Sequence, residues 1–264
     1  MTSHSLFRFP ADRLPVSIIL LLSALDFIVF FTVDNLWIVV AFWLFMIIPK
    51  GVISAWNHHH QHRNVFEKNW LNRILEFFYA LHTGVTTNLW VLHHNMGHHR
   101  NFLDQEKDQS RWKRNDDSKM GVIEYSIKIM LTAYPRGYEV GKSYPKQQKQ
   151  FLLYTSLTAL ILLGLTLYNP FNALFLFILP MIGSLLFTSW VTYGHHAGLE
   201  TDDLFKASYN NTSKWFNLLT GNLGYHTAHH FKQGLHWSKL PELHEKIKHK
   251  IPAECFKKSG FELV

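Results

Sequence analysis

The sequence has one cysteine, Cys255, in 264 residues, and only 17% of its residues are charged. A single thiol excludes a disulfide scaffold, a cysteine-rich zinc site and an iron–sulfur cluster held by this chain alone. With 47% apolar residues, the composition also excludes a disordered chain, which needs low hydrophobicity. Aromatic residues (15%) and histidines (18) are abundant instead. The aromatic content indicates a lipid environment, and the histidine content indicates metal binding.

Charged residues are nearly absent from four apolar runs: 16–33, 36–48, 151–168 and 171–193. A bilayer core needs roughly 20 helical residues, with a range of about 17 to 25. The second run reaches this length if its helix continues to residue 56, with Lys50 snorkelling to the membrane interface. Two-residue links join the runs in pairs. The sequence therefore predicts an all-α membrane protein with two transmembrane helical hairpins, whose four spans are 16–33, 36–56, 151–168 and 171–193.

The basic residues predict the orientation of these spans. Two Lys or Arg precede the first hairpin, fifteen lie between the hairpins and nine follow the second, while neither link has any. The positive-inside rule then places both termini on the cytoplasmic side. The first apolar run lacks a small-residue cleavage site, so we expect no cleaved signal peptide. We expect one membrane-bound domain over 1–264, with a cytoplasmic helical cap formed by 57–150 and 194–264.

Two further helices are expected in the cap. Residues 74–92 are apolar enough to resemble a fifth span, but such a span would put the histidines before and after it on opposite sides of the bilayer. We therefore interpret 74–92 as an interfacial or half-embedded helix. Residues 121–134 have a similar pattern and predict a second such helix.

Thirteen of the 18 histidines fall in four clusters, all outside the spans. Their spacings of three and four residues bring imidazoles to one face of a helix, as metal coordination requires. The best choice from each cluster gives nine candidate ligands: His58, His62, His94, His98, His99, His196, His226, His229 and His230. Nine ligands are too many for one ion but suit two. Imidazole accepts zinc, copper, iron or nickel, and a substrate drawn from the bilayer favours iron, which can activate oxygen to attack C–H bonds.

Three of the clusters form histidine boxes in a fixed order: H-x-x-x-H from His58, H-x-x-x-H-H from His94 and H-x-x-H-H from His226. In box order, box spacing and membrane hairpins the chain resembles the integral-membrane fatty acid desaturase and alkane hydroxylase superfamily. This resemblance implies a di-iron centre under a cytoplasmic cap, with O2 as co-substrate and a lipid chain as substrate. It also implies that the eight box histidines are ligands.

The ninth ligand is chosen by a second resemblance. Residues 192–199 are similar to the alkane hydroxylase segment N-Y-x-E-H-Y-G-L, which selects His196 over His195. The chain departs from that segment at two positions, with Thr192 in place of Asn and His195 in place of Glu.

The other polar candidates have less specific patterns. We interpret His59, His60, His93 and His195 as partners of ligands or surface residues, and His4, His82, His236, His244 and His249 as ordinary histidines. Asp26 is the one charge inside the first span, and an intramembrane carboxylate is a candidate functional residue. An acidic group follows the second box and either orients ligand imidazoles or lies in a solvated loop: Asp104, Glu106 and Asp108.

The leading hypothesis is an O2-dependent desaturase of a fatty acyl chain. Residues 221–226 and 236–241 look like bacterial desaturase-type sequences, which favours a bacterial cytoplasmic membrane. The alternative is a hydroxylase of alkyl, acyl or carotenoid chains, which residues 192–199 favour. A metal transporter is a remote alternative, because transport needs polar residues near the bilayer midplane. The membrane rule explains the positive charge without nucleic-acid binding.

The chain shows no flavin, haem or iron–sulfur motif, so an external electron donor of the ferredoxin or rubredoxin type is expected. An acidic donor would be steered by basic residues. The same residues could instead bind anionic lipid headgroups. Two clusters are candidates: Arg111, Lys113 and Arg114, and Lys246, Lys248 and Lys250.

Overall fold

The computed structural model describes residues 5–257, and in that part of the chain it contains helices but no β-strand. The chain divides into two compact units. The first consists of Met1–Asn88 and Lys146–Leu185, and the second of Leu89–Pro145 and Leu186–Val264.

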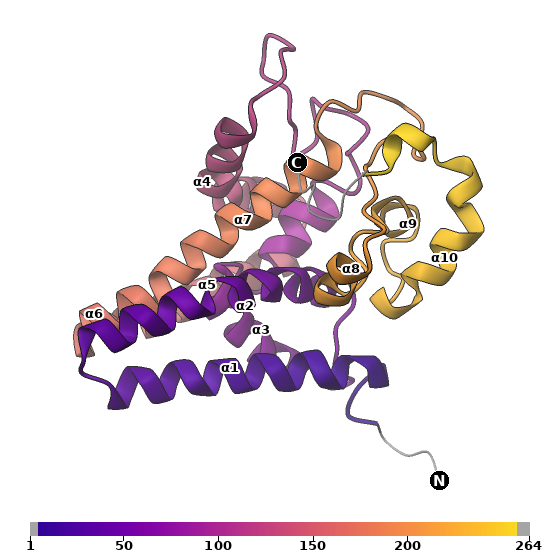
Figure 1. Cartoon of the computed structure of the whole chain (residues 1–264). Coiled ribbons are helices and arrows are strands. Elements are labelled where there is room, and N and C mark those ends of the chain that lie inside the picture. The colour runs from indigo at the N-terminus through magenta and orange to yellow at the C-terminus, as the bar shows by residue number, and fades with distance from the viewer. Residues whose placement is uncertain (1–4, 258–264) are drawn as a thin grey trace. The chain divides into compact units, whose positions relative to one another are not determined.

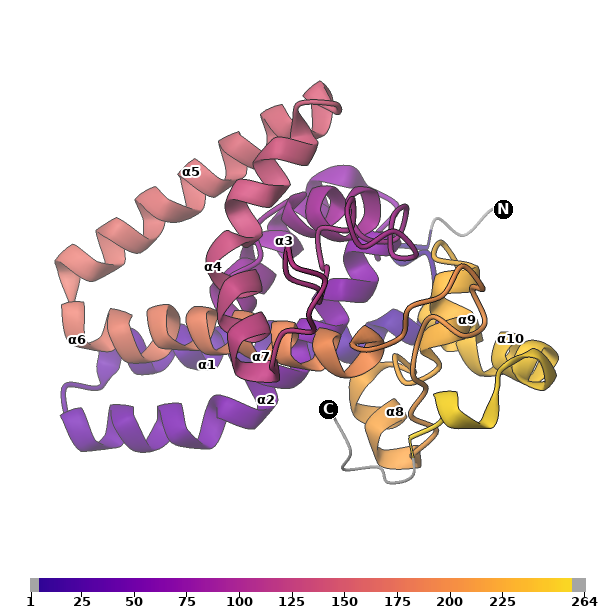
Figure 2. The same ribbon diagram turned by 90° about the horizontal axis from the view of Figure 1, so that it is seen from above.

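The first unit contains the apolar helices. These are α1 (Arg13–Thr32), α2 (Leu36–His62), α3 (Asn69–Thr83), α5 (Pro145–Tyr168), α6 (Pro170–Ala173), the π-helical turn η3 (Leu174–Ile178) and the first part of α7 (Leu179–His196). A short 3-10 turn, η1 (Pro10–Asp12), precedes α1. Figures 1 and 2 show α1 and α2 side by side, joined by a short turn.

Both hairpin links work because an asparagine caps the helix that follows. The Asn35 side chain accepts the backbone N–H groups of Trp37 and Ile38 at the start of α2. Asn169 accepts the N–H of Asn172 at the start of α6. These bonds satisfy donors that a helix N-terminus leaves unpaired. Links of three residues (33–35) and one residue (Asn169) can therefore end one span and begin the next.

Four helical stretches are long and apolar enough to cross a membrane: Pro10–Thr32, Leu36–His62, Pro145–Tyr168 and Pro170–His196. The prediction of an all-α protein with four spans is confirmed. The second stretch runs past its predicted end at 56, so α2 itself carries the first histidine box. Large side chains such as Trp37 and Leu167 are exposed on these helices, as expected for a surface that lipid covers.

Two apolar clusters hold the first unit together. One packs α1, α2 and α3 around Ile19, Ile53 and Tyr79. The other joins the far end of α1 to η3 and contains Phe30, whose ring centroid lies 5.6 Å from that of Phe177.

The prediction of a continuous interfacial or half-embedded helix over 74–92 is wrong as to its continuity. The helix α3 ends at Thr83, because Gly84 adopts a left-handed conformation with φ 69°. A Cβ at Gly84 would lie 2.7 Å from the Met181 carbonyl oxygen, so glycine also permits a close approach there. Residues 85–88, which follow, are not helical.

The second unit contains most of the histidines. Its elements are η2 (π-helical, Val91–Met96), α4 (Val122–Gly141), the end of α7, α8 (Lys214–Thr220), α9 (His226–Phe231), η4 (Trp237–Lys239), α10 (Leu240–Ile247), η5 (Lys248–Lys250) and η6 (Ala253–Cys255). The helix predicted over 121–134 is α4, which continues seven residues further.

Two anchors in the second unit support its histidine-bearing segments. The Tyr193 hydroxyl donates to the Met120 carbonyl at 2.7 Å, and the Tyr125 hydroxyl donates to the Ser110 carbonyl at 3.0 Å. These bonds hold the long loop after the second box against α4 and α7. A separate apolar cluster, which includes Ala228 and Leu240, packs α9 on α10.

Candidate metal centre

The third histidine box occupies the short helix α9. His226, His229 and His230 lie at positions i, i+3 and i+4, so all three project from neighbouring positions on the helix. The helix is held by Asn210, whose side-chain oxygen accepts the Thr227 N–H at 3.1 Å and whose amide donates to the Thr227 hydroxyl at 2.8 Å. All of these residues are buried.

The turn before α9 requires a glycine. A Cβ at Gly224 would lie 2.0 Å from the Asn211 carbonyl oxygen, which is closer than atoms can approach. The Gly224 N–H donates to the Asn217 side chain at 3.1 Å. This close packing fixes where the chain enters the third box.

The second box begins on the π-helical turn η2. The His94 carbonyl accepts both the His98 N–H at 3.0 Å and the His99 N–H at 2.8 Å. The backbone therefore folds the tandem pair back towards His94. π-Helical turns of this kind occur frequently at functional sites.

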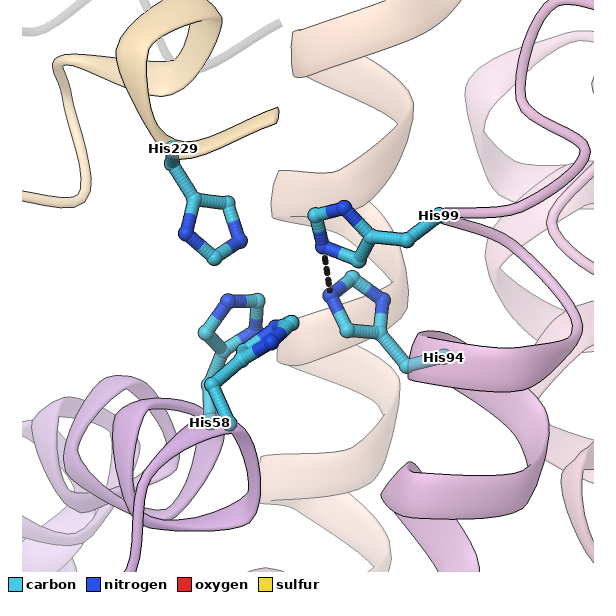
Figure 3. A group of neighbouring side chains, drawn as sticks. His58, His94, His99 and His229 are labelled. Atoms are coloured by element: carbon cyan, nitrogen blue, oxygen red, sulfur yellow. Dashed lines mark hydrogen bonds between the residues drawn. The ribbon is translucent and has the colours of Figure 1, made fainter. Parts of the chain in front are cut away.

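Six histidines of the second unit form two groups of three. In the first, the candidate ligand nitrogens of His94, His99 and His229 all lie within 4.8 Å of one another (Figure 3). In the second, those of His98, His196 and His230 do the same. Each tandem pair, His98-His99 and His229-His230, gives one imidazole to each group. Adjacent residues of a helix point about 100° apart, so His229 and His230 on α9 can serve different groups.

The distances between nitrogens fit bound cations. The Nε2 atoms of His94 and His99 are 2.9 Å apart, and those of His98 and His196 are 3.3 Å apart. Two unprotonated nitrogens repel at this distance unless a proton or a cation lies between them. Two imidazoles on one ion, each bonded at about 2.1 Å, have nitrogens roughly 3.0–3.4 Å apart. Each group could therefore hold a metal ion.

Hydrogen bonds at the second ring nitrogen orient two of these imidazoles. His98 Nδ1 lies 2.8 Å from the Asp108 carboxylate, which also accepts the Ser110 N–H at 2.7 Å. His196 Nδ1 donates to the Ala207 carbonyl at 2.9 Å. With Nδ1 protonated, Nε2 keeps the lone pair that a metal needs.

The other two acidic residues after the second box do not have this role in the described structure. Asp104 pairs with Lys107 at 2.6 Å on the surface, and Glu106 is exposed. Asp108 is therefore the carboxylate of this loop that contacts a box histidine.

His226 lies beside the second group but outside its set of three. Its Nε2 is 3.0 Å from that of His196, and its ring stacks on that of His195 at 3.9 Å between centroids. Burial, reinforced by neighbouring histidines, lowers the pKa of His226 well below its usual value. The imidazole is therefore neutral, as metal binding requires. His195 turns its Nδ1 towards the Tyr209 carbonyl at 3.4 Å.

The first box lies in the other unit, on the last turns of α2. His58, which Figure 3 also labels, and His62 have ring centroids 4.8 Å apart. Between them, His60 turns to Glu76 on α3, with 3.2 Å between its Nε2 and the carboxylate. Burial raises the pKa of Glu76, but the contacts with His60 and with Arg73 outweigh it and hold this pKa below its usual value.

Of the remaining histidines, His82 is not ordinary. Its Nε2 lies 2.8 Å from the Ser23 hydroxyl and its Nδ1 3.5 Å from the Asp26 carboxylate. Its isolated position in the sequence gave no signal of these contacts. His93 is buried and stacks on Trp90 at 5.4 Å. His4 lies outside the described residues.

The match to a family model agrees with this geometry. The fatty acid desaturase model matches residues 35–258, which include all three boxes and three of the four candidate spans. No curated protein sequence matches the chain. The family uses non-haem iron, a metal that accepts imidazole ligands such as these. The chain therefore belongs to the fatty acid desaturase family, and it is a multi-pass membrane oxidoreductase that acts on lipid.

Proposed function

We propose that this protein desaturates a fatty acyl chain with O2 at a centre of two iron ions. The observation that carries this proposal is the division of both tandem histidine pairs between two groups of three. Nine histidines hold the two ions: His58, His62, His94, His98, His99, His196, His226, His229 and His230. The two units then act as one oxidase domain.

The side chains of the site have three tasks in this reaction. Their ring nitrogens would hold the metal, which when bound would supply the activation of O2 that an unactivated C–H bond requires. The Asp108 carboxylate and the Ala207 carbonyl keep His98 and His196 in the orientation that binding needs. Burial of the imidazoles keeps bulk water from the reacting atoms.

The overall reaction fixes what else the protein needs. Two C–H bonds of the acyl chain break, one C=C bond forms, and O2 becomes two water molecules. Four electrons and four protons are consumed. The acyl chain of the substrate supplies two electrons and two protons. The other two electrons come from an external donor of the ferredoxin or rubredoxin type, and the other two protons come from solvent.

The two basic clusters that are candidate docking sites for this donor are partly neutralised by acidic residues. Arg114 pairs with Glu124, and Lys113 pairs with Glu200. Lys246 pairs with Glu242 at 2.7 Å and Lys248 with Glu245. These acids reduce the net charge of both clusters, so electrostatic steering by them is weaker than the sequence alone implies.

Hydroxylation of an alkyl, acyl or carotenoid chain is the second candidate, because residues 192–199 resemble a hydroxylase segment and His196 of that segment joins the second group. Lipid mass spectrometry of cells with and without the gene separates the two. Desaturation predicts products that have lost two hydrogen atoms. Products that have gained one oxygen atom would favour the hydroxylase.

We also propose that the boxes and both termini lie on the cytoplasmic side of a bacterial cytoplasmic membrane. The supporting observation is that, apart from Lys50 inside α2, 14 of the 26 basic residues lie between the hairpins and nine after them, with none in the two links.

A further inference from the structure

The candidate membrane spans contain a buried ion pair. Asp26 of α1 and Lys50 of α2 are 2.9 Å apart, and their side chains are 2% and 3% exposed. The prediction that Lys50 snorkels to the interface is wrong, because this side chain points inward. Its Nζ also donates to the Leu176 carbonyl at 2.7 Å. Pro180 lacks the N–H that an α-helix would offer to this carbonyl, and Lys50 takes its place.

Contacts around this pair link three helices. Asp26 of α1 pairs with Lys50 on α2. Ser23, also on α1, bonds His82 Nε2 on α3 at 2.8 Å. Polar contacts of this kind are the specific connections available between helices in an apolar medium. The network therefore fixes α1, α2 and α3 to one another.

Lys50 begins a polar stripe that leads to the first histidine box. We define the α2 polar stripe as Lys50, Ser54, Asn57 and Gln61. Their spacing of four, three and four residues puts them on one face of α2, and all four are buried.

Other residues of the stripe also form hydrogen bonds. The Asn57 amide donates to the Thr83 hydroxyl at 2.9 Å and to the Val85 carbonyl at 3.4 Å, just after α3. Gln61 donates to the Asn57 side chain at 3.2 Å. Through Lys50 and Asn57 the stripe thus contacts α1, η3 and the end of α3.

These contacts set the rotation of α2 about its axis. Turning the helix would expose the stripe to an apolar environment, which is unfavourable for unpaired polar groups. Pro49 lacks the N–H that would tie it to Phe45 in the preceding turn. The part of α2 that carries the box therefore needs anchors of its own.

His58 and His62 each follow a residue of the stripe directly, so their imidazoles point about 100° from it. We propose that the α2 polar stripe, anchored by the Asp26–Lys50 pair, positions His58 and His62 to bind metal. This inference rests on the proposed metal-binding role of the first box. Asp26 and Lys50 are positioning residues in it, since neither is among the nine candidate ligands.

A matched pair of threonine variants tests the inference. Thr83 is buried, bonds the carbonyl of its own helix at Tyr79 and also accepts from Asn57. Thr158 is buried on α5 and bonds its own helix at Tyr154. Thr83→Val removes a partner of the stripe with little change of shape, and Thr158→Val makes the same change away from it.

The measurement is competition between purified full-length protein and a chelator for Fe2+, with thermal unfolding of the metal-free protein in parallel. We expect Thr83→Val to weaken metal binding by about tenfold, the lower end of effects seen for residues that orient ligands. Thr158→Val should bind as the wild type does. Equal affinity in the two variants would overturn the inference.

The ion pair provides a second test that separates positioning from stability. Lys50→Met leaves Asp26 with a buried charge and should lower the thermal stability of the metal-free protein, whereas Asp26→Asn combined with Lys50→Met removes both charges and should recover much of it. We expect metal affinity to stay reduced in this double variant. Recovery of affinity together with stability would contradict a positioning role.

These outcomes are distinct from failure of the proposed function. If the wild type binds no iron, the metal-binding proposal itself is wrong. If the wild type binds two ions and Thr83→Val binds them equally tightly, only the positioning role is wrong.

Discussion

Asp108 accepts a hydrogen bond from His98 Nδ1 at 2.8 Å, and both side chains are buried. A carboxylate in this position orients the ring and makes its other nitrogen a better ligand. The contact joins the loop after the second box to the second group of histidines.

Replacement of this carboxylate should weaken metal binding selectively. We expect Asp108→Ala to reduce iron affinity by roughly 10-fold to 100-fold, the range found when such partners are removed. Chelator competition measures this. Asp104→Ala, which removes an exposed carboxylate four residues earlier, is the control and should change nothing. Equal effects of the two variants would show that Asp108 has no orienting role.

The histidines themselves predict the metal content. We expect about two iron atoms per chain by elemental analysis, and a loss when any of the nine named histidines is changed to Ala. His249→Ala, at an exposed position, should leave the metal content unchanged. Active protein that contains stoichiometric zinc and no iron would contradict the assignment.

His82 predicts a pH dependence of folding. Burial, and then the nearby Lys50, lower the pKa of His82 well below 6.5, so this ring is neutral in the folded protein. The unfolded chain takes up a proton as the pH falls below about 6.5. Stability is therefore lost below that pH, by up to about 1.4 kcal/mol per pH unit for this group.

Unfolding of wild type and His82→Gln at pH 7.5 and 5.5 measures this contribution. Glutamine can still bond Ser23 but does not titrate. We expect the free energy of unfolding to fall less between the two pH values in His82→Gln, by about 1 kcal/mol. Identical losses in both proteins would exclude His82 as the titrating group.

The orientation of the spans can be tested with reporter tags. Tags at Asn35 and Asn169, the two hairpin links, should face away from the cytoplasm. Tags near Lys119 and at the C-terminus should face it. A tag between His62 and His94 that lies on the opposite side from the C-terminus would exclude a metal site shared by all three boxes.

The sequence predicts the spans well because an apolar medium excludes charge, and that exclusion leaves a visible pattern. It predicts the histidine boxes because three- and four-residue spacings are local. The pairing of Lys50 with Asp26 escapes such a prediction, since a helix that is apolar on all sides does not show which face is inward. The contacts of His82 could not be predicted either, because both partners lie more than 50 residues away in the sequence.

The assignment of tandem histidines to separate groups also needs the structure. The spacing of His98 and His99 shows that they diverge, but not that His98 meets His196 and His99 meets His94. That pairing depends on the π-helical start of the second box and on where α7 ends.

The shared tandem pairs have a consequence for the order in which metal enters. An ion bound by His99 and His229 restrains the backbone that also carries His98 and His230, and so prepares the second group before it is filled. The ordering entropy lost with the first ion need not be lost again with the second. Metal uptake should therefore be cooperative, with singly loaded protein scarce at every stage of a titration.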